Sequence, residues 1–221
     1  MITKLTRWVW VAAWLLAFLA GMINVVGLLG FEHQAVTHLT GTTSMLAAAV
    51  ANGDGAATLH FAVIIGAFVA GCALSGFLLQ NSVLQLGRRY AVALLIESIL
   101  LCGAVPLLQR HQLSGLYAAA CACGLQNGMV STYTGAVVRT THVSGMFTDL
   151  GIFLGHWLRG LPVDRRRLRL CFLVITGFLG GGVAGAWVFH RLDYATLYIP
   201  GGLTGAAALA YGVYRMRRTR T

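Results

Sequence analysis

The chain has 221 residues, of which 57% are hydrophobic and 10% are charged. Soluble proteins carry about 25% charged residues, so this composition excludes an ordinary soluble domain and indicates a membrane protein. The formal net charge is +10, and the basic residues gather between or beyond the apolar segments, at Lys4 and Arg7, Arg88 and Arg89, Arg165–Arg169 and Arg215–Arg220. The positive-inside rule gives this pattern, because Lys and Arg of short loops stay on the cytoplasmic side. The charge therefore argues against nucleic acid as a partner.

Six apolar segments follow one another along the chain, at residues 8–30, 58–80, 90–108, 113–135, 168–190 and 195–214. Each holds about the 20 residues that an α-helix needs to cross a bilayer core of about 30 Å. The alternating strands typical of a membrane barrel are absent from the sequence pattern. The sequence therefore predicts an all-α membrane protein with about six transmembrane helices, in which residues 1–221 form one transmembrane domain.

A polar motif occurs twice along the chain. Thr37-His38-Leu39-Thr40-Gly41 matches Thr141-His142-Val143-Ser144-Gly145, and ahead of these, Gly21-Met22-Ile23-Asn24 matches Gly124-Leu125-Gln126-Asn127. This internal two-fold repeat divides the chain into halves 1–110 and 111–221. Each half is predicted to hold a long helix, a short helix opened by the motif (37–51 or 141–158), and two more long helices.

The third element of each half carries small residues four apart. They are Ala67, Gly71 and Ser75 in the first half, and Gly177, Gly181 and Gly185 in the second. Such rows let helix backbones approach closely in a membrane. They predict helix packing within the chain, and they also permit a homodimer.

The two short helices determine how the halves are related. From Gly41 to Ala51 is about 17 Å of helix, about half a bilayer. If the short helices re-enter, the halves are inverted, and of the 16 basic residues only Arg110 and Arg191 lie outside. If the short helices span, the halves are parallel and four basic residues lie outside: Arg88, Arg89, Arg139 and Arg191. The charge pattern favours an inverted repeat with both termini in the cytoplasm.

The two motifs are the predicted substrate-binding site. Half-length helices whose N-termini meet in mid-membrane are a common way for a transporter to bind an anion or a polar solute. The predicted binding residues are His38, Thr40, Gly41, Thr42, His142, Ser144 and Gly145. In the alternative interpretation, the hydroxyl and glycine residues only cap and pack two short helices.

Two acidic residues are candidates for coupling or gating. Asp149 follows the second motif by about one helical turn, where it can bind a coupling cation or pair with Arg139 or His142. Glu97 lies in the middle of an apolar segment, where it serves either a buried structural hydrogen bond or a proton relay.

Asn24 and Asn127 are interpreted as structural residues that form hydrogen bonds between helices. The five cysteines all fall in apolar segments and lack the spacing of a zinc site. Neither a metal nor a cofactor is predicted.

The spacing of these motifs carries a family resemblance. The first half has Gly-x-x-Asn followed by Thr-His-x-Thr-Gly-x-Thr, and the second half has Gly-x-Gln-Asn followed by Val138–Gly145 and Thr148–Gly151. Together they resemble the YoaK family, over essentially the whole chain. The resemblance implies an uncharacterised six-span protein of the bacterial inner membrane and adds no activity. One departure is Gly41-Thr42-Thr43, where the expected pattern is Gly-Asn-Thr.

The sequence predicts a small-solute secondary transporter or permease whose halves exchange roles in alternating access. Its expected partners are membrane lipid and a small polar or anionic solute. An intramembrane enzyme is the alternative, although helix positions turn by about 100° per residue, so His142 and Ser144 do not share a face. We therefore expect no enzyme. A non-catalytic membrane assembly factor is the third interpretation.

Overall fold

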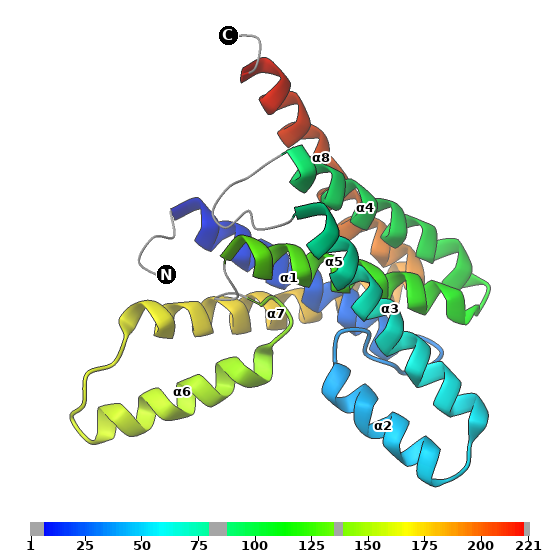
Figure 1. The fold of residues 1–221 in the computed structure, drawn as a ribbon, viewed down its shortest axis with the longest axis horizontal. Helices are drawn as coiled ribbons and strands as arrows, with labels where there is room; N and C mark the ends of the chain where they lie inside the picture. Colours follow the sequence, from blue (N-terminus) through cyan, green and yellow to red (C-terminus); the bar gives the residue numbers. More distant parts are fainter. Residues whose placement is uncertain (1–6, 80–87, 135–138, 219–221) are drawn as a thin grey trace.

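The computed structural model describes residues 7–79, 88–134 and 139–218, and the regular structure within these ranges is all helical (Figure 1). Lys4, Val138 and Arg220, which belong to patterns described above, lie outside these ranges. The helices are α1 (Arg7–Leu29), α2 (Leu39–Ala51), α3 (Gly55–Leu79), α4 (Arg88–Gln109), α5 (Leu113–Thr134), α6 (Val143–Leu158), α7 (Arg165–Leu192), the 3-10 helix η2 (Asp193–Leu197) and α8 (Tyr198–Arg218). The all-α fold class is confirmed.

Several of these helices have the length and composition of membrane spans. Within the described residues, four stretches qualify: Trp8–Leu29, Gly55–Leu79, Arg89–Gln109, and Arg165–Val213, which runs through α7 and α8. The 22-residue α5, also predicted to span, is not among them. Its adjacent amides, Gln126 and Asn127, lower its hydropathy. The protein is therefore a helical membrane protein, and the prediction of six crossings rests on α5 and on the division of α7 from α8.

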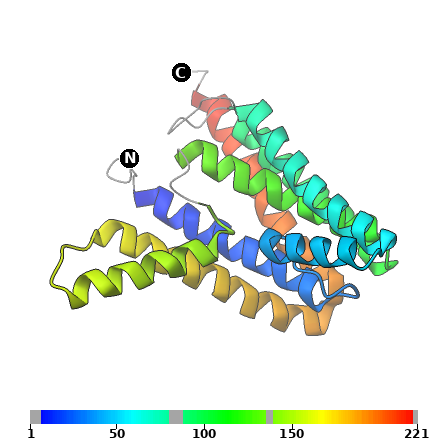
Figure 2. The same ribbon diagram turned by 60° about the horizontal axis from the view of Figure 1, so that its bottom comes forward.

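The helices α2 and α6 are short and begin beside the interior of a long helix. They have 13 and 16 residues, or about 20 and 24 Å at 1.5 Å per residue, less than a bilayer core. α2 packs on α3 and α6 packs on α7, as two hairpins (Figures 1 and 2). Thr37, just before α2, bonds to Asn24 within α1, and Thr140, before α6, bonds to Gln126 within α5.

The long helices pack in pairs, and each pair joins a helix of the first half of the sequence to a helix of the second half. α1 packs along α7, and α3 packs along α5. Glycines make this approach possible, because a Cβ atom at these positions would collide with a backbone carbonyl oxygen of the partner helix: Gly21 and Gly181 between α1 and α7, and Gly71 and Gly124 between α3 and α5. The prediction that Gly71 and Gly181 serve helix packing is confirmed.

The remaining pairs of long helices are unequal. α4 packs along both α5 and α8, whereas α8 makes few contacts with α1. In the repeat predicted from the sequence, α1 corresponds to α5 and α4 to α8, so the α4–α5 pair corresponds to the α8–α1 pair. One of these two matched interfaces is closed, and the other is open. The repeat itself stays a prediction.

Candidate functional site

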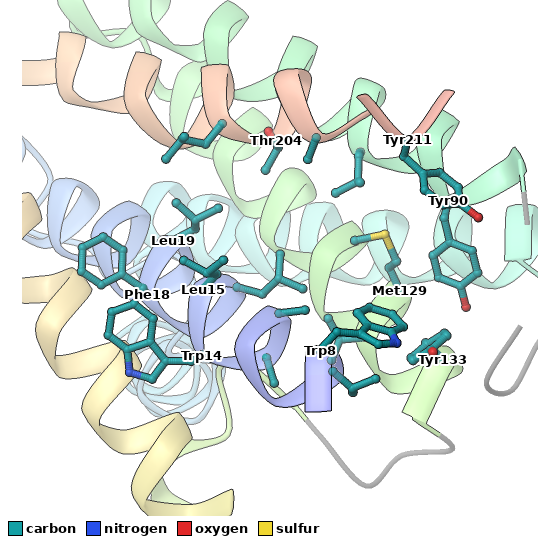
Figure 3. Close-up of a pocket in the computed structure, with 18 of the residues that line it drawn as sticks. Trp8, Trp14, Leu15, Phe18, Leu19, Tyr90, Met129, Tyr133, Thr204 and Tyr211 are labelled. Atoms are coloured by element: carbon teal, nitrogen blue, oxygen red, sulfur yellow. The ribbon is translucent and has the colours of Figure 1, made fainter. Parts of the chain in front are cut away.

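A cavity of about 490 Å³ lies between α1 and α8 (Figure 3). Residues of α4 and α5 complete its wall. Leu15 of α1 and Leu203 of α8 both line it, and they are 49% and 53% exposed. The cavity therefore opens sideways, through the gap where α1 and α8 separate.

The wall of the cavity is almost entirely apolar. Thr134 and Thr204, which line it, donate their hydroxyl hydrogens to carbonyls of their own helices, Thr134 to Val130 at 2.8 Å and Thr204 to Pro200 at 3.0 Å. These hydroxyls are thus already used in local hydrogen bonds. The wall is suited to the hydrocarbon part of a molecule.

Three tyrosines and Trp8 line one end of the cavity, whereas Trp14 and Phe18 lie at the other end (Figure 3). The ring centroids of Trp8 and Tyr133 are 5.7 Å apart, and those of Tyr90 and Tyr133 are 5.8 Å apart in an edge-to-face arrangement. Tyr211 of α8 lines the same end. Tyrosine and tryptophan present an apolar body with a polar tip, so this end can hold the polar part of an amphipathic molecule.

A buried polar chain joins α4, α5 and the start of α6. Gln126 Nε2 donates to Glu97 Oε1 at 3.0 Å, and Thr140 Oγ1 donates to Gln126 Oε1 at 3.4 Å. All three side chains are fully buried, and Glu97 Oε2 has no hydrogen-bond partner among the described residues. Leu94 and Met129, which line the cavity, lie three positions from Glu97 and Gln126 on the same helices. This set of hydrogen-bonded side chains therefore lies about one helical turn from the cavity wall.

The first motif has a different buried network. The backbone N–H and the hydroxyl of Thr37 both donate to Asn24 Oδ1, at 3.0 and 2.7 Å. Gln34 Nε2 donates to Thr42 Oγ1 at 2.9 Å, and both of these side chains are buried. Asn24 thus fixes the segment before α2, and Thr42 fixes the first turn of α2.

The histidines of the motifs occupy the N-cap positions of α2 and α6. The side chains of His38 and His142 are exposed and form no capping hydrogen bond. Thr40 and Ser144 are exposed as well. Neither motif contributes a residue to the cavity wall, and no hydrogen bond or ion pair of the described residues joins the motifs to each other.

Gly41 and Gly145 have a local role within their motifs. A Cβ atom at Gly41 would lie 3.0 Å from Nδ1 of His38, and one at Gly145 would collide with the ring of His142. In both motifs, the glycine makes room for the histidine ring one turn earlier.

Asp149 is paired with Arg167 of α7. The Arg167 Nη2 to Asp149 Oδ2 distance is 3.2 Å, and Arg167 Nε also donates to Asp149 Oδ2 at 3.2 Å. The partners expected from the sequence were Arg139 and His142, and the structure places the pair with Arg167 instead. Sequence spacing did not suggest this partner, because the two residues lie 18 positions apart and come together only when α6 and α7 form a hairpin. The ion pair links the two helices of that hairpin.

Sequence reasoning overlooked Gln126 and chose its neighbour. Asn127, the residue that matches Asn24, has a buried Oδ1 without a partner among the described residues. Gln126 makes the bonds between elements. The available signal was an amide inside an apolar segment, where polar side chains seek partners on other helices.

Comparison with known proteins gives a family and no activity. The profile described as "Protein of unknown function (DUF1275)" matches residues 12–210. No curated protein and no solved structure matches the chain. The match agrees with the expectation of an uncharacterised family, whereas the YoaK name and the six spans stay predictions. Because the match covers nearly all of the chain, this protein belongs to the DUF1275 family.

Proposed function

We propose that this protein is a secondary transporter of small solutes and that the cavity between α1 and α8 is part of the solute pathway. The observation that carries the proposal is the contrast between two matched interfaces: α4 packs along α5, whereas α1 and α8 separate around a cavity. Transporters built from inverted halves work by exchanging such conformations between the halves. In the opposite state, α1 and α8 would close and α4 and α5 would separate.

The cavity favours a solute with a largely apolar body. Its volume of about 490 Å³ falls within the range of about 300–1,000 Å³ of small-molecule sites. The side opening at Leu15 and Leu203 would face lipid in a membrane, so an amphipathic solute can enter from the bilayer. We place the protein in the bacterial inner membrane, with both termini in the cytoplasm, on the pattern of its basic residues.

A polar or anionic solute is the second candidate, bound at the starts of α2 and α6. The N-caps His38 and His142 form no side-chain cap bond, so the first N–H groups of both helices stay available to an anion. His38, Thr40, Gly41, Thr42, His142, Ser144 and Gly145 would then bind the solute as the two ends converge in another state.

Blocking the cavity tests the proposal directly. Ala207 and Ala206 are both exposed alanines of α8, but only Ala207 lines the cavity. In proteoliposomes assayed with a panel of amphipathic and anionic solutes, we expect Ala207→Trp to abolish flux and Ala206→Trp to retain it. A folded Ala207→Trp protein that transports at the wild-type rate would exclude the cavity as the pathway.

The double variant His38→Ala/His142→Ala separates the two candidates. Flux of an amphipathic solute is expected to continue in this variant, because the cavity is unchanged. Loss of flux in the folded double variant, with normal flux in Ala207→Trp, would move the pathway to the half-helix motifs.

A further inference from the structure

Glu97 stands apart from the other acidic residues of the chain. It is fully buried in α4, and it is the one Asp, Glu, Lys or Arg classed as buried among the described residues. Its Oε1 accepts a hydrogen bond from Gln126, but its Oε2 has no partner there. Ionisable groups inside a membrane span are costly and mark pathways for ions or protons. A carboxyl group in this position therefore needs a function or a compensating ligand.

The surroundings of Glu97 favour a proton as that ligand. We infer that Glu97 binds a proton that is exchanged during the transport cycle, so this inference rests on the proposed transport function. Metal cations such as Ca²⁺ and Mg²⁺ take about six or more oxygen ligands. Here Gln126 presents its NH₂ group to the carboxyl group, not its oxygen. A proton on Oε2 needs no further ligand to neutralise the charge.

No opposite charge of the described residues compensates Glu97. On α5, the titratable group that interacts with it is the buried thiol of Cys123. α8 faces α4 with Gly201 and Gly205, and Tyr194 of η2 accepts a hydrogen bond from Phe31. The helix α3 has few contacts with α4. Its Cys72 donates to the carbonyl of Gly124. Among the described residues, the charge of an ionised Glu97 would thus be unpaired.

The position of Glu97 connects its proton to the cavity. Leu94, one turn earlier on α4, lines the cavity, and Ser98 packs against Gly205 of α8. α8 therefore closes over this part of α4 and forms a wall of the same cavity. When water reaches Glu97, the O–H bond breaks, the proton passes to water, and the carboxylate stays hydrated. When α8 excludes water, the proton returns and the neutral acid is buried.

The position of Glu97 also connects its proton to α6. Gln126 donates to Glu97 and at the same time accepts from Thr140, two residues before the N-cap His142. An ionised carboxylate attracts the Gln126 NH₂ group more strongly than a neutral acid does. Loss of the proton thus strengthens the hydrogen bond from Gln126 to Glu97, and Gln126 is also the side chain that bonds to the start of α6. The proton site, the cavity and one of the two short helices form a continuous connection.

Infrared difference spectroscopy of the full-length reconstituted protein tests the proton site without a transported solute. Spectra recorded across a pH titration are expected to contain, beside the bands of the exposed carboxyl groups, a separate C=O band of a buried protonated carboxyl group, which disappears as pH rises. Glu97→Gln should lack this separate band. Asp164→Asn, which removes an exposed carboxylate at the N-cap of α7, should retain it. A Glu97→Gln spectrum with the wild-type band would overturn the inference.

A conservative variant and a labelling rate complete the test. Glu97→Asp keeps an acid at this position and should shift both the frequency of the C=O band and the pH midpoint at which the band disappears. If Glu97→Gln fails to fold, an unchanged band in Glu97→Asp would count against Glu97 as the proton site. With the five native cysteines replaced, Ala207→Cys reacts with a water-soluble maleimide at a rate that rises with pH in any background, because the thiolate is the reacting species. The rate is therefore measured with and without Glu97→Gln. The ratio of the two rates should change with pH, and a ratio that stays constant would refute the link to the cavity.

The two proposals can fail independently. A Glu97 band that titrates in a protein without flux of any tested solute would reject the transport function and leave the proton site. Flux that stops in Ala207→Trp, with no Glu97 band at any pH, would reject the proton site and leave the pathway.

Discussion

The two motif regions have the same order of elements but satisfy their polar groups differently. In the first, Asn24 accepts two hydrogen bonds from Thr37, and the network is closed. In the second, Gln126 accepts from Thr140 and donates to Glu97, whose other oxygen has no partner within the described ranges. The first region therefore has the character of a structural anchor. The second has the same anchoring bond and adds a buried acid, so the proposed proton site belongs to this region.

The two regions share one type of contact but place it at different positions of the long helix. A hydroxyl residue before a short helix bonds to an amide inside the preceding long helix in both regions. The separation along the chain is 13 residues in the first region and 14 in the second. The acceptor in the second region is Gln126 and not Asn127, and adjacent positions on a helix point about 100° apart. The Gln126 position is the one that bonds to Glu97 of α4.

The largest expected effect is a difference in stability between leucine variants of the two adjacent amides of α5. Gln126→Leu leaves Glu97 Oε1 and the Thr140 hydroxyl without their partner, both of them buried. We expect the free energy of unfolding to fall by about 2–4 kcal/mol, because an unsatisfied buried polar group costs about 1–3 kcal/mol. Denaturant titration of the detergent-solubilised protein, followed by circular dichroism, measures this change.

Asn127→Leu is the matched control for that substitution. Its buried Oδ1 has no partner in the part of the chain that the structure describes, so its removal is expected to cost less than about 1 kcal/mol. If the two leucine variants lose equal stability, the assignment of the second anchor to Gln126 is wrong.

A smaller effect is expected in the first region. Asn24→Ala removes the acceptor of two hydrogen bonds, whereas Thr37→Val removes one of them and keeps the backbone N–H bond. Hydrogen bonds between helices in membranes contribute about 0.6 kcal/mol on average and up to about 1.7 kcal/mol. Asn24→Ala should therefore cost about 1–2 kcal/mol and Thr37→Val about half of that. A double-mutant cycle in the same denaturant assay gives the coupling energy, and a value near zero would contradict the anchor.

Much of the fold follows from features that the sequence contains locally. Length and apolar composition located the helices, and the motif located the starts of α2 and α6, predicted at 37 and 141 and observed at Leu39 and Val143. Glycine spacing predicted that Gly181 serves helix packing, because a backbone approach needs a residue without a side chain, and the structure identifies α1 as its partner.

The candidate site could be predicted only in part, since it depends on contacts between distant segments. Glu97 was recognised as an acid in an apolar segment, but its bond to Gln126 depends on the rotation of α5 relative to α4. The cavity results from the separation of α1 from α8, and no residue of the sequence encodes that gap by itself. His38 and His142 recur in both motifs, yet their side chains are exposed, so recurrence alone did not identify the buried polar residues.

The smallest expected effect concerns Asp149, the acid that the second region adds at its surface. Its side chain is 21% exposed and that of its partner Arg167 is 54% exposed. Pairs that water reaches contribute about 0–1 kcal/mol, and salt screens them. Asp149→Asn should therefore reduce the free energy of unfolding by less than about 1 kcal/mol at low salt, and the difference from wild type should vanish in about 1 M salt. Glu97→Gln should keep its effect in salt, because a buried group is screened little. An Asp149→Asn protein that loses the pH-dependent carboxyl band would transfer the proton site from the buried chain to the α6–α7 hairpin.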